Sequence, residues 1–268
     1  MVRQDVVARL AEAGCVAADR EADELLHAAD TQRRDIADLL DRRVTGEPLA
    51  WVTGVTTFCD QVIRVHPGVY VPRPHTEALA RRAIAALPPN GIAVDVCTGS
   101  GAIAAVLAAN RPGARILATD IDPAAVACAR ANGVTALTGE LDTPLPAHLR
   151  GRVDVITAVA PYVPAEALHL LPRDVQAFEP RHALDGGPGG SRYLGSLITR
   201  SAQHWLRPGG ALLLEVGGDQ AAPMASLMQA SDLEVIEIIR DDDGDERGIV
   251  GRRLRGRASR PGECRPGR

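Results

Sequence analysis

Apolar residues recur at helical spacing through the first 45 residues of the chain. Positions three or four residues apart lie on one face of a helix. The residues that follow this spacing are Val6, Val7, Leu10, Ala11, Ala22, Leu25, Leu26, Ile36, Leu39 and Leu40. A helical hairpin or small bundle of this size buries little apolar surface by itself. We therefore expect residues 1–45 to form a short helical N-terminal region that docks on the rest of the chain.

Residues 46–90 have a different pattern, in which β-branched residues are separated by glycine and proline. Such a pattern is typical of short strands and turns. We expect a β-hairpin followed by an extended linker. Within the linker, Arg73 and Glu77 are expected to form a structural ion pair. Farther along the chain, Glu179 is expected to stabilise a loop turn.

From residue 91 onward, short apolar runs alternate with helical segments. Strands are predicted at 92–97, 115–120, 134–139, 152–159, 210–217, 233–240 and 247–254, and helices at 101–111, 122–132, 196–206 and 220–230. This alternation predicts an α/β fold with a mostly parallel sheet and helices on both faces. The last two strands have no helix between them, so we expect an antiparallel pair at the edge. Residues 91–254 would form this domain.

The composition is typical of a globular protein and gives no sign of a membrane span or a metal site. Hydrophobic residues make up 46% of the chain and supply a sizeable core, although aromatic residues make up only 3%. No apolar run reaches the roughly 18 residues of a membrane span, and the five cysteines lack metal-binding spacing. We expect a cytoplasmic protein without a metal site. Residues 255–268 are expected to form a disordered basic tail, without direct nucleic-acid binding.

The first strand of the predicted sheet ends in a glycine turn, DVCTGSGAIA. Gly99 and Gly101 allow a tight turn and a close approach of the backbone to a ligand, and the turn precedes a helix N-terminus. The turn lacks the G-K-[ST] ending of a phosphate-binding loop. Ala104 stands where a dinucleotide-binding turn carries its third glycine. Asp95, at the start of the turn, is expected to bond the turn amides or a ligand ammonium group.

The next two strands end in further candidate ligand-binding residues. Asp120 lies about 20 residues beyond the glycine turn, where a carboxylate can accept hydrogen bonds from ribose hydroxyls. Asp122 is better placed to cap the following helix. Ile121 is expected beneath an adenine ring, with Glu140 at the adenine edge and Leu141 on its other face. An adenosine site without a phosphate-binding element favours S-adenosylmethionine over NAD or ATP.

Together these motifs resemble those of the protein-(glutamine-N5) methyltransferases, the release-factor methyltransferase family, over about residues 30–253. The matching segments are GEPLAWVTG, HPGVYVPRPHTE, DVCTGSGAIA, ATDID, APYVP, FEPRHALDGG, LRPGGALLLEVGGDQ and DDDGDERGIVGRR. The resemblance implies a Rossmann-like class I methyltransferase sheet and a release factor as the protein substrate. It implies that S-adenosylmethionine is bound by Cys97, Thr98, Gly99, Ser100, Gly101 and Asp120, with Leu141 beside the adenine. It also implies a catalytic acceptor loop formed by Val159, Ala160, Pro161 and Tyr162.

The acceptor loop departs from the family pattern Asn-Pro-Pro-Tyr, because Val159 occupies the Asn position and Ala160 the first Pro position. In the family, the Asn carbonyl and a backbone carbonyl accept the amide N–H bonds and aim the nitrogen at the methyl group. A valine side chain accepts no hydrogen bond, so glutamine methylation by this arrangement is expected to be impaired. Tyr162 is expected to pack on the aliphatic stem of the acceptor.

Three outcomes of this departure are open. In the first, the acceptor is a carboxamide held by the backbone carbonyls of Val159 and Ala160 together with some other residue. Alternatively, it is a better nucleophile, such as an amine or hydroxyl of a small molecule in secondary metabolism. In the third outcome, the protein binds the cofactor but has lost methyl transfer.

Overall fold

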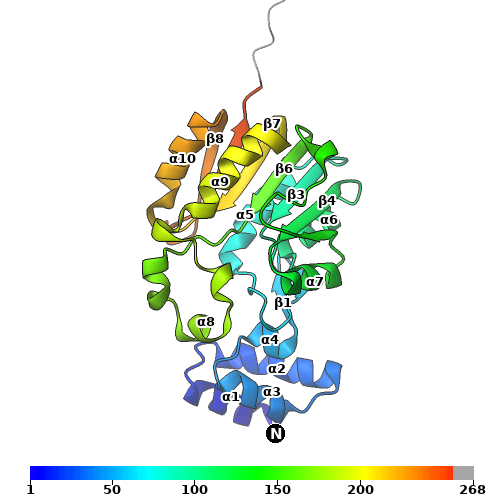
Figure 1. Cartoon of the computed structure of the whole chain (residues 1–268). Helices are drawn as coiled ribbons and strands as arrows, with labels where there is room; N and C mark the ends of the chain where they lie inside the picture. Colours follow the sequence, from blue (N-terminus) through cyan, green and yellow to red (C-terminus); the bar gives the residue numbers. More distant parts are fainter. Residues whose placement is uncertain (256–268) are drawn as a thin grey trace, which may run out of the picture.

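The computed structural model describes residues 1–255, so residues 256–268 of the predicted basic tail lie outside the described part. Figure 1 shows a helical unit at one end of the molecule and a larger α/β body above it. The helices of this unit are α1 (Arg3–Glu12), α2 (Ala18–Gln32), α3 (Ile36–Val44) and α4 (Leu49–Thr53). The apolar positions that predicted helices in this region form their shared core, which includes Val6, Leu10, Ala22, Leu25, Leu39 and Leu40.

The α/β body is built on a seven-stranded sheet in the order β5-β4-β3-β6-β7-β9-β8. Its strands are β3 (Ile92–Val96), β4 (Arg115–Asp120), β5 (Ala136–Thr138), β6 (Val153–Ala158), β7 (Leu206–Glu215), β8 (Leu233–Arg240) and β9 (Glu246–Arg253). Strands β3 to β7 are mutually parallel, whereas β9 pairs antiparallel with both β7 and β8. The predicted mostly parallel sheet with an antiparallel pair at its edge is confirmed. Within that pair, the last strand of the chain is inserted next to β7 and leaves β8 outermost.

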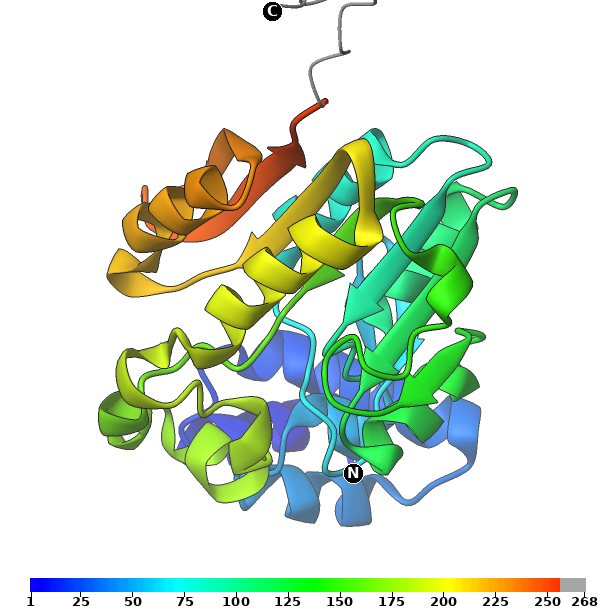
Figure 2. The same cartoon turned by 45° about the horizontal axis from the view of Figure 1, so that its top comes forward.

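Helices cover both faces of the sheet. Helices α9 (Arg192–Arg200) and α10 (Ala221–Ala230) lie on one side, where Figure 2 shows them in yellow and orange. The opposite side carries α5 (Glu77–Ala86), α6 (Ala102–Asn110) and α7 (Pro123–Ala131). Successive side chains of a strand point to opposite faces of the sheet. Leu212 and Leu214 of β7 therefore pack in the core under α9 and α10, whereas Leu213 packs in the core under α5 and α6. A short helix, α8 (Arg173–Phe178), lies in the long connection between β6 and α9.

The predicted hairpin is formed by β1 (Val55–Phe58) and β2 (Gln61–Arg64). Phe58 and Ile63 are buried in the same core as α5 and α6, so the hairpin is anchored to the α/β body. No helix within residues 1–255 has the length and apolar character needed to cross a membrane.

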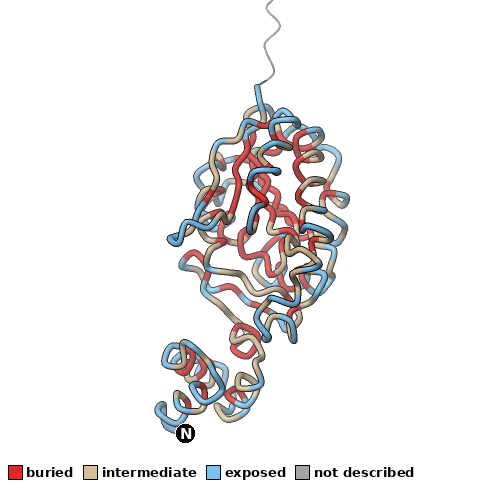
Figure 3. Tube along the Cα trace, turned by 90° about the vertical axis from the view of Figure 1, so that its left-hand side faces the viewer, coloured by how far each residue is buried: buried red, intermediate tan, exposed pale blue. Residues whose placement is uncertain are grey.

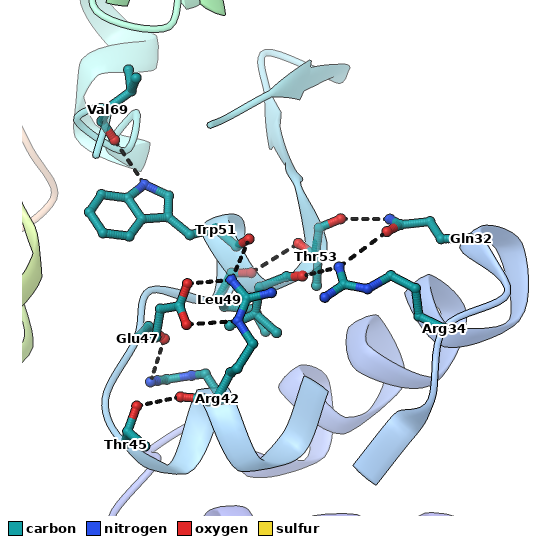
Figure 4. A network of polar contacts seen from close by, with 11 residues as sticks. Gln32, Arg34, Arg42, Thr45, Glu47, Leu49, Trp51, Thr53 and Val69 are labelled. Carbon is teal, nitrogen blue, oxygen red and sulfur yellow. Dashed lines mark hydrogen bonds and ion pairs between the residues drawn. The ribbon is translucent and has the colours of Figure 1, made fainter. Parts of the chain in front are cut away.

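A narrow neck around α4 joins the helical unit to the body (Figure 3). On the unit's side, Gln32 Nε2 donates to the Thr53 carbonyl at 2.6 Å, and Arg34 donates to the Val52 carbonyl at 2.8 Å. On the body's side, the buried Trp51 indole N–H donates to the Val69 carbonyl at 2.9 Å (Figure 4). The Trp51 ring also meets the edge of Phe178, with ring centroids 6.4 Å apart. Helix α4 is therefore held from both sides.

Replacing Trp51 with Phe removes the indole donor and leaves the Val69 carbonyl without its buried partner. An unpaired buried polar group costs about 1–3 kcal/mol, so we expect Trp51→Phe to lower the free energy of unfolding by that amount in urea titrations followed by circular dichroism. Val62→Ala, at a position 71% exposed on the hairpin, is the control and should change it by less than about 0.5 kcal/mol. A Trp51→Phe protein as stable as the parent would contradict the role given to this bond.

Candidate functional site

The predicted glycine turn lies at the carboxyl end of β3, where parallel strands place ligand-binding residues. Cys97, Gly99 and Gly101 have φ values of 56°, 55° and 80°. Glycine adopts this left-handed region freely, whereas a residue with a Cβ atom is strained there. At Gly101 packing also demands glycine, because a Cβ would lie 2.8 Å from the Cβ of Ala129 on α7. The left-handed conformation of Cys97 was not predicted from the sequence.

Asp95 is a buried carboxylate near the end of β3. Its Oδ1 accepts the Thr157 hydroxyl at 2.7 Å, and its Oδ2 accepts the Thr98 hydroxyl at 2.5 Å. These hydroxyls, rather than the predicted turn amides, are its hydrogen-bond partners. Burial raises the pKa of Asp95 to about 6, although both hydroxyl bonds favour the charged form. Asp95 thus joins β3, the glycine turn and β6.

Asp120, at the end of β4, receives the turn amide. Its Oδ2 accepts the Gly99 N–H at 2.8 Å, and its Oδ1 accepts the Asp122 N–H at 3.0 Å. Burial raises the pKa of Asp120, and the two backbone bonds oppose that rise. Asp122 caps α7 by accepting the Ala124 N–H at 2.8 Å, as predicted. Each oxygen of Asp120 keeps further lone pairs for a ligand hydroxyl.

The loop after β5 forms another side of the site. Leu141 has a φ of 48°, and its carbonyl accepts the Thr119 hydroxyl at 2.6 Å. This bond ties the loop to β4, and Glu140, Leu141 and Ile121 line the same cavity. Ile121 is 59% exposed. A flat apolar ligand would cover it.

A cavity, here called the first cavity, lies in front of these strand ends. All the residues predicted to bind a cofactor line it except Gly101, which faces Ala129: they are Asp95, Cys97, Thr98, Gly99, Ser100, Asp120, Ile121, Glu140 and Leu141. The buried Ser100 hydroxyl has no hydrogen-bond partner within residues 1–255. Such a group is costly to bury unless a ligand satisfies it. No cluster of three or more potential metal-ligating side chains is found in the same range.

A second cavity lies on the other side of the acceptor loop. Its lining includes Ala160 and Tyr162 of the loop, Arg73 and His75 of the linker, and Val175 of α8. Tyr70, Val159 and Ala183 line both cavities, so these three residues form the wall between them. Pro161 lines the first cavity only. The loop predicted from the sequence as the acceptor loop therefore separates two adjoining cavities.

Tyr162 is held by the buried carboxylate of Glu215, a residue that was not among the predicted site residues. Its hydroxyl donates to Glu215 Oε1, at the end of β7, over 3.0 Å. The Thr76 hydroxyl donates to Glu215 Oε2 at 2.5 Å, and His75 Nε2 lies 3.3 Å from Oε1. The Tyr162 carbonyl accepts from the side-chain amide of Gln220 at 2.8 Å. The loop's conformation thus depends on β7, the linker and the start of α10.

The prediction that Arg73 pairs with Glu77 is wrong. Arg73 lies 2.5 Å from Glu179 Oε1, whereas Glu77 pairs with Arg81 one turn along α5. Glu179 is buried and its Oε2 lacks a partner within residues 1–255. Burial raises the pKa of Glu179, which the charge of Arg73 counteracts. Arg73 and Glu179 lie 106 positions apart, so no local pattern could have paired them.

The chain is similar to known methyltransferases. The methyltransferase small domain family matches residues 63–141. The release factor glutamine methyltransferase of Salmonella typhimurium is 38% identical over 83% of this chain and 82% of that protein. The one of Mycobacterium leprae is 34% identical over 92% of this chain and 94% of that protein. The ribosomal protein L11 methylase structure from Lactobacillus delbrueckii is 21% identical, covers 74% of this chain and 89% of its own, and shares the fold with a TM-score of 0.52.

The raised pKa of Asp95 predicts a pH-dependent stability. Because the folded state holds the proton more tightly than the unfolded chain, the free energy of unfolding should fall as the pH rises from about 4 to about 6. Asp95→Asn removes this titration. The difference in unfolding free energy, parent minus variant, should therefore decrease by roughly 2–3 kcal/mol over this interval, as measured by urea titrations at several pH values. A difference that is constant with pH would show that the pKa of Asp95 is not raised in the folded protein.

Proposed function

The chain belongs to the family of release factor glutamine methyltransferases, and on this premise we propose that it methylates the N5 nitrogen of a glutamine side chain in a translation release factor. The cofactor of the reaction is S-adenosylmethionine. The observation that carries the proposal is the pair of adjoining cavities, separated by the acceptor loop and two neighbouring residues. One cavity is suited to the methyl donor, and the other to the side chain that receives the methyl group.

The first cavity offers the groups that an adenosine-containing cofactor requires. Asp120 retains lone pairs for ribose hydroxyls, and the exposed face of Ile121 suits an adenine ring. The unpartnered Ser100 hydroxyl and the buried Asp95 belong to the glycine-turn segment, where a polar group of the cofactor would fit. When bound, S-adenosylmethionine supplies an electrophilic methyl group on a sulfonium sulfur. The role of the protein is to hold a weak nucleophile beside that methyl group.

The acceptor loop can orient a carboxamide through its backbone. An amide nitrogen is a poor nucleophile because its lone pair is delocalised, so precise positioning contributes several kcal/mol to catalysis. No backbone N–H of residues 1–255 donates to the carbonyls of Val159 or Ala160. These carbonyls are free to accept an N–H of the acceptor, although Val159 supplies no side-chain oxygen. Tyr162, fixed by Glu215, lines the second cavity and offers its ring to an aliphatic stem.

The proposal also assigns the parts of the chain. Residues 91–254 would form the methyltransferase domain, and residues 46–90 the hairpin and linker that close the site. The helical region of residues 1–45 would meet the protein substrate. Since release factors act in translation, we expect the enzyme in the cytoplasm.

A direct assay tests the proposal. The purified protein and radiolabelled S-adenosylmethionine are incubated with a release factor that carries a Gly-Gly-Gln loop, and in parallel with the same factor after replacement of that glutamine. Label on the first factor alone is expected. Label found only on small amines or alcohols offered separately would favour a small-molecule methyltransferase. Cofactor binding by calorimetry without any transfer would indicate a protein that has lost the reaction.

Val159→Asn should improve glutamine methylation. The variant restores a side-chain acceptor for an amide N–H, and a missing buried hydrogen bond of this kind costs about 1–3 kcal/mol. We expect kcat/KM for the release factor to rise by about tenfold. Val159→Leu, similar in size to the Asn variant but without an acceptor, is the control and should give no gain. A loss of activity in Val159→Asn would indicate that Val159 is suited to a different acceptor.

A further inference from the structure

The wall between the two cavities contains one polar side chain. Of the three residues that line both cavities, Val159 and Ala183 are apolar, and Tyr70 carries a hydroxyl. The loop position that carries Asn in the family pattern thus offers only methyl groups here. Any side-chain hydrogen bond from this wall to the group that receives the methyl has to come from Tyr70.

Tyr70 is held in place by its neighbours. The Arg73 Nε–H donates to the Tyr70 oxygen at 3.3 Å, and the Arg73 guanidinium carbon lies 4.8 Å from the centroid of the Tyr70 ring. Arg73 is itself fixed by Glu179 at 2.5 Å. The ring is therefore oriented by a chain of interactions that begins at a buried carboxylate. A rigid group of this kind binds a ligand with little loss of conformational freedom.

The hydroxyl of Tyr70 still has a hydrogen bond to give. A phenol has one O–H donor and lone pairs for two acceptors, and Arg73 occupies one lone pair. Within residues 1–255 the hydroxyl proton has no acceptor. Burial raises the pKa of Tyr70 to about 12, despite the opposing charge of Arg73. The group thus remains a protonated donor at neutral pH.

A carboxamide matches this arrangement. Its oxygen needs a donor, and its nitrogen needs acceptors such as the free carbonyls of Val159 and Ala160. We propose that the Tyr70 hydroxyl binds the oxygen of the acceptor carboxamide and so directs its nitrogen toward the first cavity. The inference rests on the proposed function and assigns the group that compensates for Val159. The contribution is positional, because a hydrogen bond to the oxygen does not make the amide nitrogen a better nucleophile.

The test removes the hydroxyl in three backgrounds. Tyr70→Phe is made in the parent protein, in Val159→Asn and in Val159→Leu, and each protein is assayed with S-adenosylmethionine and the release factor. In the parent, Tyr70→Phe should lower kcat/KM by about tenfold to a hundredfold, with the calorimetric Kd for S-adenosylmethionine changed by less than about twofold. The same loss should occur in the Val159→Leu background. In Val159→Asn, the restored Asn orients the amide independently, and the loss should shrink to about threefold or less.

The outcomes separate the two proposals. A parent protein without activity on the release factor would overturn the proposed function and this inference with it. An active parent whose kcat/KM is unchanged by Tyr70→Phe would overturn the inference alone. Equal losses in all three backgrounds, or a loss matched by weaker S-adenosylmethionine binding, would also overturn it, because both would point to a structural or cofactor-binding role. Thermal melting of each variant identifies any loss that is due to unfolding.

Discussion

One buried carboxylate holds together the strand ends on which the site is built. Asp95 lies opposite Thr157 in the parallel pairing of β3 with β6, and it binds the hydroxyls of Thr157 and Thr98. Because the Asp95 side chain is buried, both of its oxygens need hydrogen-bond donors from the protein. The two threonines meet this need, and in doing so they fix the glycine turn relative to the strand that leads into the acceptor loop.

The sequence predicted the features that depend on local pattern. Strand periodicity placed Gly99 and Asp120 at neighbouring strand ends, and they share a hydrogen bond. Contacts between distant side chains could not be predicted. Glu215 meets Thr76 across 139 positions, and neither motif indicates the other. The insertion of β9 between β7 and β8 was also hidden, because an apolar run specifies a strand but not its neighbours in the sheet.

At position 159 the sequence and the side-chain arrangement in the structure complement each other. The sequence reveals that a polar side chain is missing from the acceptor loop, and it leaves the acceptor open. It cannot show which other side chain faces the same space, because Tyr70 belongs to the linker and its rotamer is set by Arg73. Only the shared wall of the two cavities brings Tyr70 and Val159 together. The effect of losing the Asn side chain at position 159 therefore depends on the other side chains that line the same cavities.

The contact between Trp51 and Phe178 has a mechanical consequence. Phe178 is followed directly by Glu179, which holds Arg73 at the second cavity. The segment that packs against the neck therefore also carries the anchor of the cavity wall. The helical unit and the wall of the second cavity are thus joined through two consecutive residues, Phe178 and Glu179.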